Sequence, residues 1–386
     1  MSVDELQARI DAISADIDRQ KNILKQLERS KSALQRQLNN IRDPVARLPL
    51  ELSSEIFLHC LPRAPSLTPQ VHTVAPLLLL QICNGWTDIA LSTPTLWATI
   101  RMGLEAPGVE LLEVWLQRAH NCGLSISLLS TLQDRLRAAT ILHKSTEYLK
   151  HLEIYEEEGH ALLPSSMTIF PCLETLIICG ARNPYGCTYF GLATVVELLS
   201  LTPNLVECTL HHFYHTWDEL QPPPHLTLPN LTCLKFGRTT NIYDLGSWDY
   251  ILRYMTLPAL QTLFFPFSDI PAGDFFLFLD RSSPPLRKLV IGAECGHFSF
   301  AELSGWIHTV PSLVHLEMRV PVDIMNDLFT AIAENPSDFL PHLQNLQIYH
   351  DIDSWGFDQA AYEVLLQTLL IRRGTLLLST TKISPA

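Results

Sequence analysis

Long apolar runs are missing from this 386-residue sequence, and charged residues are scarce. The longest apolar runs, at 77–80 and 275–279, fall far short of the roughly 20 residues that span a bilayer. Charged residues make up 17% and hydrophobic residues 47%, a balance typical of globular chains rather than disordered ones. The net charge of −13 disfavours a nucleic-acid surface, which would need clustered Lys and Arg.

Paired cysteines and a targeting signal are missing as well. The nine cysteines are an odd number, and none stands in C-x-x-C spacing. Such usage is typical of a reduced intracellular protein, in which thiols serve as small apolar side chains. The first ten residues are charged and lack the apolar core of a signal peptide. We therefore expect a cytoplasmic or nuclear protein that does not bind a membrane.

Catalytic motifs are absent too. The sequence has no phosphate-binding glycine loop, no H-E-x-x-H zinc helix and no G-x-S-x-G nucleophile elbow. A zinc site takes four N or S ligands, and the nearest candidate is the group Cys208, His211, His212 and His215. Because Cys208 occupies an apolar position of a predicted strand and the histidines follow it into a loop, they need not share a face. We expect no metal, no cofactor and no catalytic residue.

What the sequence does contain begins with a heptad pattern over residues 3–41, free of Gly and Pro. Its seam alternates steps of three and four: Val3, Leu6, Ile10, Ile13, Ile17, Gln20, Leu24, Leu27, Lys31, Leu34, Leu38 and Ile41. A 3.5-residue period over more than five heptads predicts a coiled coil. The alternative is one amphipathic helix folded back onto its own domain. The narrow seam leans toward self-association, so we expect a homodimer through residues 3–41.

Three short helices are predicted between residues 44 and 101. The first begins at Pro49, where a missing N–H costs nothing, and stops before Pro62. The second covers 76–90, and a break at 92–94 precedes a short third segment. A module this small and apolar buries little of its apolar surface by itself. The apolar surface that remains exposed needs a partner.

The module contains Leu48-Pro49-x-Glu51-Leu52, Ile56, Ile82-Cys83-x-x-Trp86-x-x-Ile89-Ala90 and Leu96-Trp97. In order and in kind, this residue pattern resembles the F-box. Two features depart from the family: Asn84-Gly85 stands where a Lys or Arg usually follows the Cys, and the gap over 62–76 is long. The resemblance implies binding to the Skp linker protein of Skp–cullin–F-box ubiquitin ligases. The residues it assigns to the linker face are Leu48, Pro49, Leu52, Ile56, Cys83 and Trp97, with Trp86 and Ile89 closer to the core.

A repeat of the form Pro-x-Leu-x-x-Leu-x-Leu fills the rest of the chain. Its eight copies start 24 to 32 residues apart, at Leu149, Leu173, Leu205, Leu231, Leu260, Leu286, Leu313 and Leu343. Seven copies have a proline two residues before that first Leu: Pro171, Pro203, Pro229, Pro258, Pro284, Pro311 and Pro341. The last two apolar positions are two apart, so they fall on one face of a short strand. We expect each proline to end a helix and turn the chain toward the next strand.

Helices are predicted between these strands, at 191–201, 245–255, 275–280, 300–308, 322–333 and 359–372. Helices at 108–119 and 134–142 and a strand at 124–129 precede the repeats, and a closing strand is predicted at 375–379. Strand–helix units of this kind bury their apolar faces only by stacking side by side. The pattern resembles an irregular leucine-rich repeat, although it varies in period and lacks the usual Asn after the strand.

Parallel strands in such a solenoid present alternate side chains to the open concave face. The residue between the two inward positions of each strand defines a row that we term the ladder: Glu153, Ile177, Thr209, Lys235, Phe264, Val290, Glu317 and Gln347. Apolar residues near its middle and polar residues at its ends are typical of a protein-binding surface, so we predict that the ladder binds a client. The alternative is that these apolar residues are scattered surface residues without function.

The expected architecture is α/β, with a coiled-coil-like helix (1–43), a three-helix F-box-like domain (44–101) and a leucine-rich-repeat solenoid (102–386). This order resembles that of fungal F-box proteins. The resemblance implies a non-enzymatic substrate adaptor of a ubiquitin ligase, whose partners are the Skp linker, a cullin complex and an unknown protein client. The alternative is a scaffold that sequesters partners without ubiquitin transfer.

Overall fold

A computed structural model describes most of the chain. The described residues are 3–45, 48–61, 75–103, 106–130, 143–156, 169–180, 182–183, 186–190, 192–211, 213–215, 223–237, 249–265, 270–291, 299–319, 322–335, 338–351, 363, 367 and 375–381. The chain forms two compact units. One comprises Met1–Thr99 and Val114–Cys122, and the other comprises Ile100–Glu113 and Gly123–Ala386.

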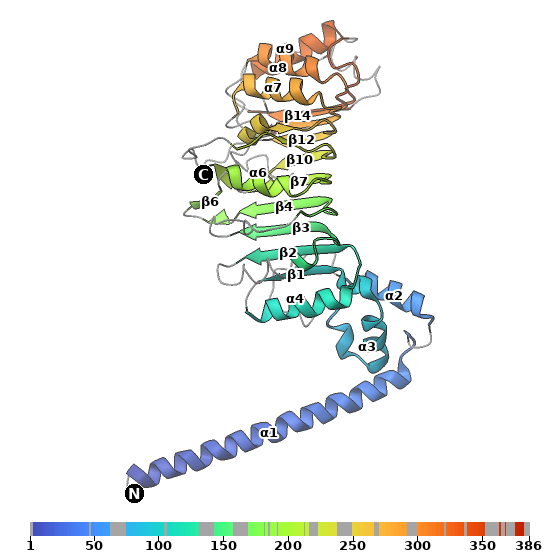
Figure 1. Cartoon of the computed structure of the whole chain (residues 1–386), viewed down its shortest axis with the longest axis vertical. Coiled ribbons are helices and arrows are strands. Elements are labelled where there is room, and N and C mark those ends of the chain that lie inside the picture. The colour runs from blue at the N-terminus through green and yellow to red at the C-terminus, as the bar shows by residue number, and fades with distance from the viewer. Residues whose placement is uncertain are drawn as a thin grey trace. The chain divides into compact units, whose positions relative to one another are not determined.

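The first unit begins with a 40-residue helix, α1 (Val3–Arg42), as the heptad pattern predicts (Figure 1). Exposed ion pairs one turn apart support it, such as Arg19 with Asp16 at 3.1 Å. The apolar side chains of its seam from Leu6 to Ile41 are 41% to 76% exposed. The described part of the chain therefore does not cover this stripe.

Short helical segments follow α1: α2 (Leu50–His59), the 3-10 turn η3 (Leu79–Gln81), α3 (Asn84–Leu91) and the 3-10 turn η4 (Pro94–Trp97). The single helix predicted over 76–90 is wrong, because Cys83 between η3 and α3 has an extended backbone with φ −157° and ψ 171°. Asn84 and Gly85 are poor helix formers, so the helix restarts there instead of continuing. The Cys83 carbonyl accepts the Thr87 N–H at 3.0 Å and thereby begins α3.

The second unit is built on one eleven-stranded sheet, ordered β1-β2-β3-β4-β7-β10-β12-β13-β14-β15-β16. Every pair from β2 to β16 is parallel, which gives ten parallel strands stacked in chain order (Figure 1). The strands are β1 (Thr99–Gly103), β2 (Leu124–Ser130), β3 (Leu149–Glu156), β4 (Thr175–Gly180), β7 (Glu207–His211), β10 (Cys233–Phe236), β12 (Thr262–Phe265), β13 (Lys288–Ile291), β14 (His315–Arg319), β15 (Asn345–Asp351) and β16 (Thr375–Thr381). The strands predicted at 124–129 and 375–379 are thus confirmed.

Helices return the chain between many of these strands. They are α4 (Ala106–Ala119), α6 (Leu192–Ser200), α7 (Ala272–Ser282), α8 (Phe300–Thr309) and α9 (Val322–Glu334). With α1, α2 and α3 they make eight α-helices among the described residues, and the fold is mixed α/β. The α-helix predicted over 245–255 is replaced, in its described part, by the 3-10 helix η5 (Asp249–Tyr254). Those predicted at 134–142 and 359–372 lie outside the described residues, apart from residues 363 and 367.

Smaller strands accompany the main sheet. A parallel pair joins β9 (Leu226–Thr227) to β11 (Met255–Thr256). A second small sheet contains β5 (Arg182–Asn183), β6 (Gly186–Phe190) and β8 (Phe213–His215). The sequence pattern did not predict these pairs, because two or three residues carry no readable periodicity.

The repeated prolines occupy β-turns that lead into the strands. In six of the seven repeats the residue before the proline accepts a hydrogen bond from the N–H of the Leu three residues later, at 3.1 to 3.4 Å. The proline is therefore the second residue of the turn, where its fixed φ suits the geometry. The six prolines are Pro171, Pro203, Pro229, Pro258, Pro311 and Pro341. At Pro284 the bond is tighter, from Leu286 N–H to the Pro284 carbonyl at 2.8 Å.

A backbone ladder links successive repeats just before their strands. One carbonyl in each repeat accepts two consecutive N–H groups of the next repeat, at 2.8 to 3.1 Å. These carbonyls belong to Glu174, Val206, Thr232, Gln261, Arg287 and Val314. Backbone N–H and C=O groups of successive repeats thus hydrogen-bond to one another. These bonds explain how the repeats stack although the asparagine that usually follows the strand is missing.

Candidate functional site

Helix α2 is apolar on two faces. Phe57 and Ser53 on one face are completely buried, whereas Leu52 and Ile56, one turn apart on the other face, are 55% and 43% exposed. Leu48, one turn before Leu52, is 40% exposed and extends the exposed stripe. The apolar residues of α2 therefore extend beyond its packed face, and the stripe Leu48–Leu52–Ile56 is an uncovered apolar surface.

Packing within the same unit fixes the buried face of α2. The Phe57 ring lies 4.9 Å from the Trp86 ring of α3. Trp86 donates its indole N–H to the Asp43 carboxylate at the end of α1, and the Cys83 thiol lies 3.8 Å from the same carboxylate. Ser54 of α2 and Thr93 share a hydrogen bond at 2.8 Å. These contacts hold α2 against α3 with its exposed stripe turned outward.

The residues predicted to contact the linker do not all lie at the surface. Leu48, Pro49, Leu52 and Ile56 are exposed, as a contact surface requires. Cys83 and Trp97 are completely buried and cannot contact a partner directly in this conformation. Each lies against a residue of the same unit: Cys83 is next to Asp43, and Trp97 is next to Ala90.

Trp97 is held in the core by three contacts. Its indole N–H donates to the Ala90 carbonyl at 2.8 Å, and its ring meets that of Trp115 edge to face at 5.1 Å. The Arg118 guanidinium lies 4.5 Å from the same ring.

Three further leucines of this module are 40% to 49% exposed, although the F-box pattern does not assign them to the linker face: Leu50, Leu78 and Leu91. The sequence shows only that these three residues are apolar, and this does not distinguish a surface position from a core position.

The eight ladder residues lie side by side in one register across the sheet. Each is the Cα partner of the next, in the order Glu153, Ile177, Thr209, Lys235, Phe264, Val290, Glu317 and Gln347. Their sequence neighbours before and after are buried in every strand, as with Leu263 and Phe265 around Phe264. The ladder residues themselves are half-buried, except Val290 at 6% exposure. The sequence therefore gave the correct face of all eight strands.

Helices pack on the opposite face of the sheet. Phe265 of β12 stacks on Phe275 of α7 with ring centroids 4.7 Å apart, and the Phe275 ring meets Trp306 of α8 at 5.1 Å. Since side chains alternate along a strand, the ladder faces away from these helices. It is the face of the sheet that α7 and α8 leave uncovered.

Polar contacts at the two ends hold the ladder side chains in place. Glu153 accepts hydrogen bonds from the Ser127 hydroxyl at 2.6 Å and the Tyr155 hydroxyl at 2.5 Å. At the other end, Gln347 donates to the Tyr349 hydroxyl, and His315 Nε2 lies 3.5 Å from the Glu317 carboxylate. Both end carboxylates are therefore oriented before any partner arrives.

Burial shifts the pKa of ring groups beside the ladder. Partial burial lowers the pKa of His151 below its ordinary value, although the nearby carboxylates of Glu153 and Glu207 oppose the shift. Burial also raises the pKa of Tyr349, and the Glu317 carboxylate adds to that rise. Near neutral pH both of these rings are therefore uncharged.

Two of the candidate metal ligands, Cys208 and His211, lie on opposite faces of β7. Cys208 is buried on the helix side of β7, whereas His211, three residues along the strand, falls on the ladder side. Burial raises the pKa of the Cys208 thiol to about 12, which keeps it protonated and unsuited to bind a metal. His212 lies outside the described residues, and no group of three His, Cys, Asp or Glu side chains in the described part of the chain is placed to hold a metal ion.

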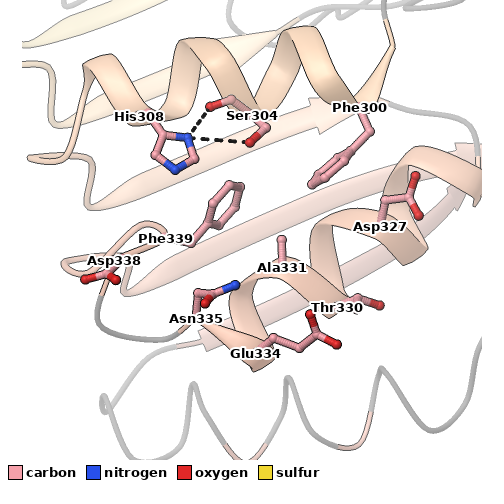
Figure 2. Close-up of a pocket in the computed structure, with 10 residues that line it drawn as sticks. All are labelled: Phe300, Ser304, His308, Asp327, Thr330, Ala331, Glu334, Asn335, Asp338 and Phe339. Carbon is pink, nitrogen blue, oxygen red and sulfur yellow. Dashed lines mark hydrogen bonds between the residues drawn. The ribbon is translucent and has the colours of Figure 1, made fainter.

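A hollow of about 570 Å³ opens between α8 and α9, away from the ladder (Figure 2). Phe300 and Phe339 form its apolar wall, with ring centroids 6.4 Å apart. Three carboxylates, those of Asp327, Glu334 and Asp338, line it without a Lys or Arg. Such a lining suits a positively charged side chain.

The α2 stripe is an apolar surface, and the ladder is a surface of apolar and oriented polar side chains. No protein-family model matches the chain. No curated protein matches it either. None of the helices that the structure describes is both long enough and apolar enough to cross a membrane.

Proposed function

We propose that the chain is the substrate-recognition subunit of a Skp–cullin–F-box ubiquitin ligase in the cytoplasm or nucleus. The observation that carries the proposal is the second apolar face of α2. Leu48, Leu52 and Ile56 are exposed on a helix whose other face is already packed through Phe57. In the F-box pattern these are the positions assigned to the Skp linker.

The uncovered side of the sheet is the proposed client surface. Leucine-rich spacing, turns that begin at a proline and a parallel sheet with helices on one face support a leucine-rich-repeat solenoid. In such a solenoid the open strand face is the customary binding surface, and here it carries the ladder. The chain would not be an enzyme; it would act by raising the effective concentration of a client near the transferring enzyme.

The α1 seam supports a homodimer that would present two client surfaces. A parallel, in-register pair places Gln20 opposite Gln20 of the second copy, where the two amides can hydrogen-bond. The same arrangement brings Asp16 of one copy next to Lys21 of the other. At the other positions beside the seam, no two residues of like charge from the two copies face each other. The same parallel pair sets Lys31 opposite Lys31, which costs stability and helps to fix the register.

The test is affinity purification of the full chain from cells, followed by detection of the Skp linker and the cullin. We expect both to be recovered with the wild type and lost with Leu52→Lys combined with Ile56→Lys. Ala8→Lys combined with Ala15→Lys is the matched control, because it adds two lysines to the outer side of α1 and leaves α2 intact. Circular dichroism checks that each variant is folded.

Three other outcomes decide against parts of the proposal. Recovery of the linker without the cullin would favour the scaffold alternative. Recovery of neither protein with the wild type would remove the F-box assignment. Equal recovery with the wild type and the Leu52/Ile56 variant would remove α2 as the docking helix.

A further inference from the structure

Two lysines flank the phenylalanine in the middle of the ladder. The Lys288 ammonium lies 5.0 Å from the centroid of the Phe264 ring and the Lys235 ammonium lies 5.8 Å from it. They come from the strands on either side: Lys235 of β10 is in register with Phe264 of β12, and Lys288 of β13 is in register with Thr262. With strands about 4.8 Å apart, the cluster spans about 10 Å of the sheet.

The two lysines are not neutralised by the described protein. Neither forms a salt bridge with a described carboxylate, in a chain with 40 acidic and 27 basic residues. The carboxylates nearest in strand order are Glu207 of β7 and Glu317 of β14, each one strand beyond the cluster. The face therefore alternates in charge, with a cationic and aromatic centre between two acidic flanks.

An apolar surface adjoins the cations. The Phe264 ring is half-buried, and Val290 is its neighbour in the ladder. The attraction between an ammonium and an aromatic ring is weak at an exposed site and does not replace a counter-ion. The cluster can thus receive an anionic group and an apolar group side by side.

We propose that the Lys235–Phe264–Lys288 cluster binds a short acidic segment of a protein client. One or two carboxylates of the segment pair with the lysines, and an adjacent apolar side chain packs against the exposed part of the Phe264 ring. This inference rests on the proposed function, because it gives the chemistry of the client that the ladder recognises. The flanking Glu207 and Glu317 select against a longer acidic run and favour neutral or basic residues on both sides of the acid.

The charge pattern distinguishes this client from a nucleic acid. A phosphate backbone carries a charge at every nucleotide and would meet Glu207 or Glu317 one strand beyond the lysines. A net charge of −13 also repels a polyanion at long range, whereas an isolated carboxylate within a Debye length of about 8 Å feels mainly the two lysines. The cluster therefore recognises one or two isolated carboxylates rather than a continuous run of negative charge.

The test is a selection of short random peptides, displayed on phage, against the full-length chain. We expect enrichment of peptides in which Asp or Glu is next to Leu, Ile, Val or Phe. A synthetic peptide of the enriched sequence should bind about tenfold more weakly to Lys235→Met combined with Lys288→Met, as expected for close charge pairs. Raising the salt concentration should weaken binding to the wild type.

Two variants act as controls. Lys150→Met removes a lysine that already pairs with Glu174 at 2.8 Å, so it should leave the peptide affinity unchanged. Lys288→Arg keeps the charge and should retain most of the binding. The midpoint of thermal unfolding, measured for every variant, separates loss of the site from loss of the fold.

Failure to enrich acidic peptides, whether neutral peptides or none are recovered, would overturn the inference. If neutral peptides are enriched and Phe264→Asp abolishes their binding, the ladder remains the client surface and only the acidic chemistry is wrong. If the enriched peptides ignore both Phe264 and the lysines, the client half of the proposed function fails with the inference. Linker recovery tests the α2 half independently.

Discussion

Phe264 and Phe265 follow one another along β12 and face opposite sides of the sheet. Phe265 is 2% exposed and stacks on Phe275 of α7 at 4.7 Å, whereas Phe264 lies between the two lysines on the uncovered side. One phenylalanine therefore holds the fold together, and the other is available to a partner. The same division between a packed face and a free face recurs on α2.

On the packed side of the sheet, Phe275→Ala should destabilise the second unit. The ring is completely buried between Phe265 and Trp306, so its removal leaves a cavity that costs about 3–5 kcal/mol of unfolding free energy. Phe276→Ala is the matched control, because Phe276 is 40% exposed and the loss of its ring should cost clearly less than the loss of Phe275. Urea unfolding measures both. Equal effects would contradict the packing described above.

The two faces of α2 should respond differently to truncation. Phe57→Ala removes a completely buried ring that contacts Trp86 and should cost about 3–5 kcal/mol of stability in the first unit. Leu52→Ala removes a side chain that is 55% exposed and should leave stability almost unchanged while weakening recovery of the Skp linker. Tryptophan fluorescence during denaturation reports the first effect. A strongly destabilised Leu52→Ala protein would mean that α2 has no free face.

The α1 seam should determine the mass in solution. Ile13→Lys combined with Ile17→Lys places charges in a stripe that a second copy would bury, so we expect sedimentation equilibrium to give a monomer for this variant and a dimer for the wild type. Ala8→Lys combined with Ala15→Lys lies on the outer side of the helix and should remain a dimer. Gln20→Leu should tighten the dimer, because it removes a buried polar pair. A monomeric wild type would exclude the coiled coil.

Cys208 should make stability fall at alkaline pH. Burial raises the pKa of its thiol to about 12, against 9.0 for an ordinary thiol. Between these values the unfolded chain loses the proton and the folded chain keeps it, so the unfolding free energy drops by about 1.4 kcal/mol per pH unit above 9. The contribution is fully present below pH 9 and is lost as the pH rises toward 12.

The check is the stability of the wild type relative to Cys208→Ala, measured at pH 8 and at pH 10.5. The difference should shift by about 2 kcal/mol in favour of the variant at the higher pH. Cys172→Ala provides the comparison, because that thiol is exposed. A pH-independent difference for Cys208→Ala would show that the thiol titrates normally in the folded protein.

Local spacing in the sequence was sufficient to predict the elements that depend on periodicity. The heptad gave α1, and the Leu-x-Leu spacing after each turn gave the strands and the side of the sheet on which each ladder residue lies. This works because the geometry of a strand or a helix relates neighbours along the chain by a fixed repeat, whatever lies farther away. The spacing predicted the helix around residue 250 but not its 3-10 type, and it missed the break at Cys83, which has no period.

Only the tertiary structure decided which apolar residues are covered. Leu52 and Trp97 both matched the F-box pattern, yet one is half-exposed and the other is fully buried against Trp115 and beneath Arg118. Likewise, the sequence placed Lys235 and Phe264 in one row but gave no reason to bring Lys288 to the same ring. Burial and charge pairing arise between segments far apart in the chain, and their energies depend on distances in space that local spacing does not contain.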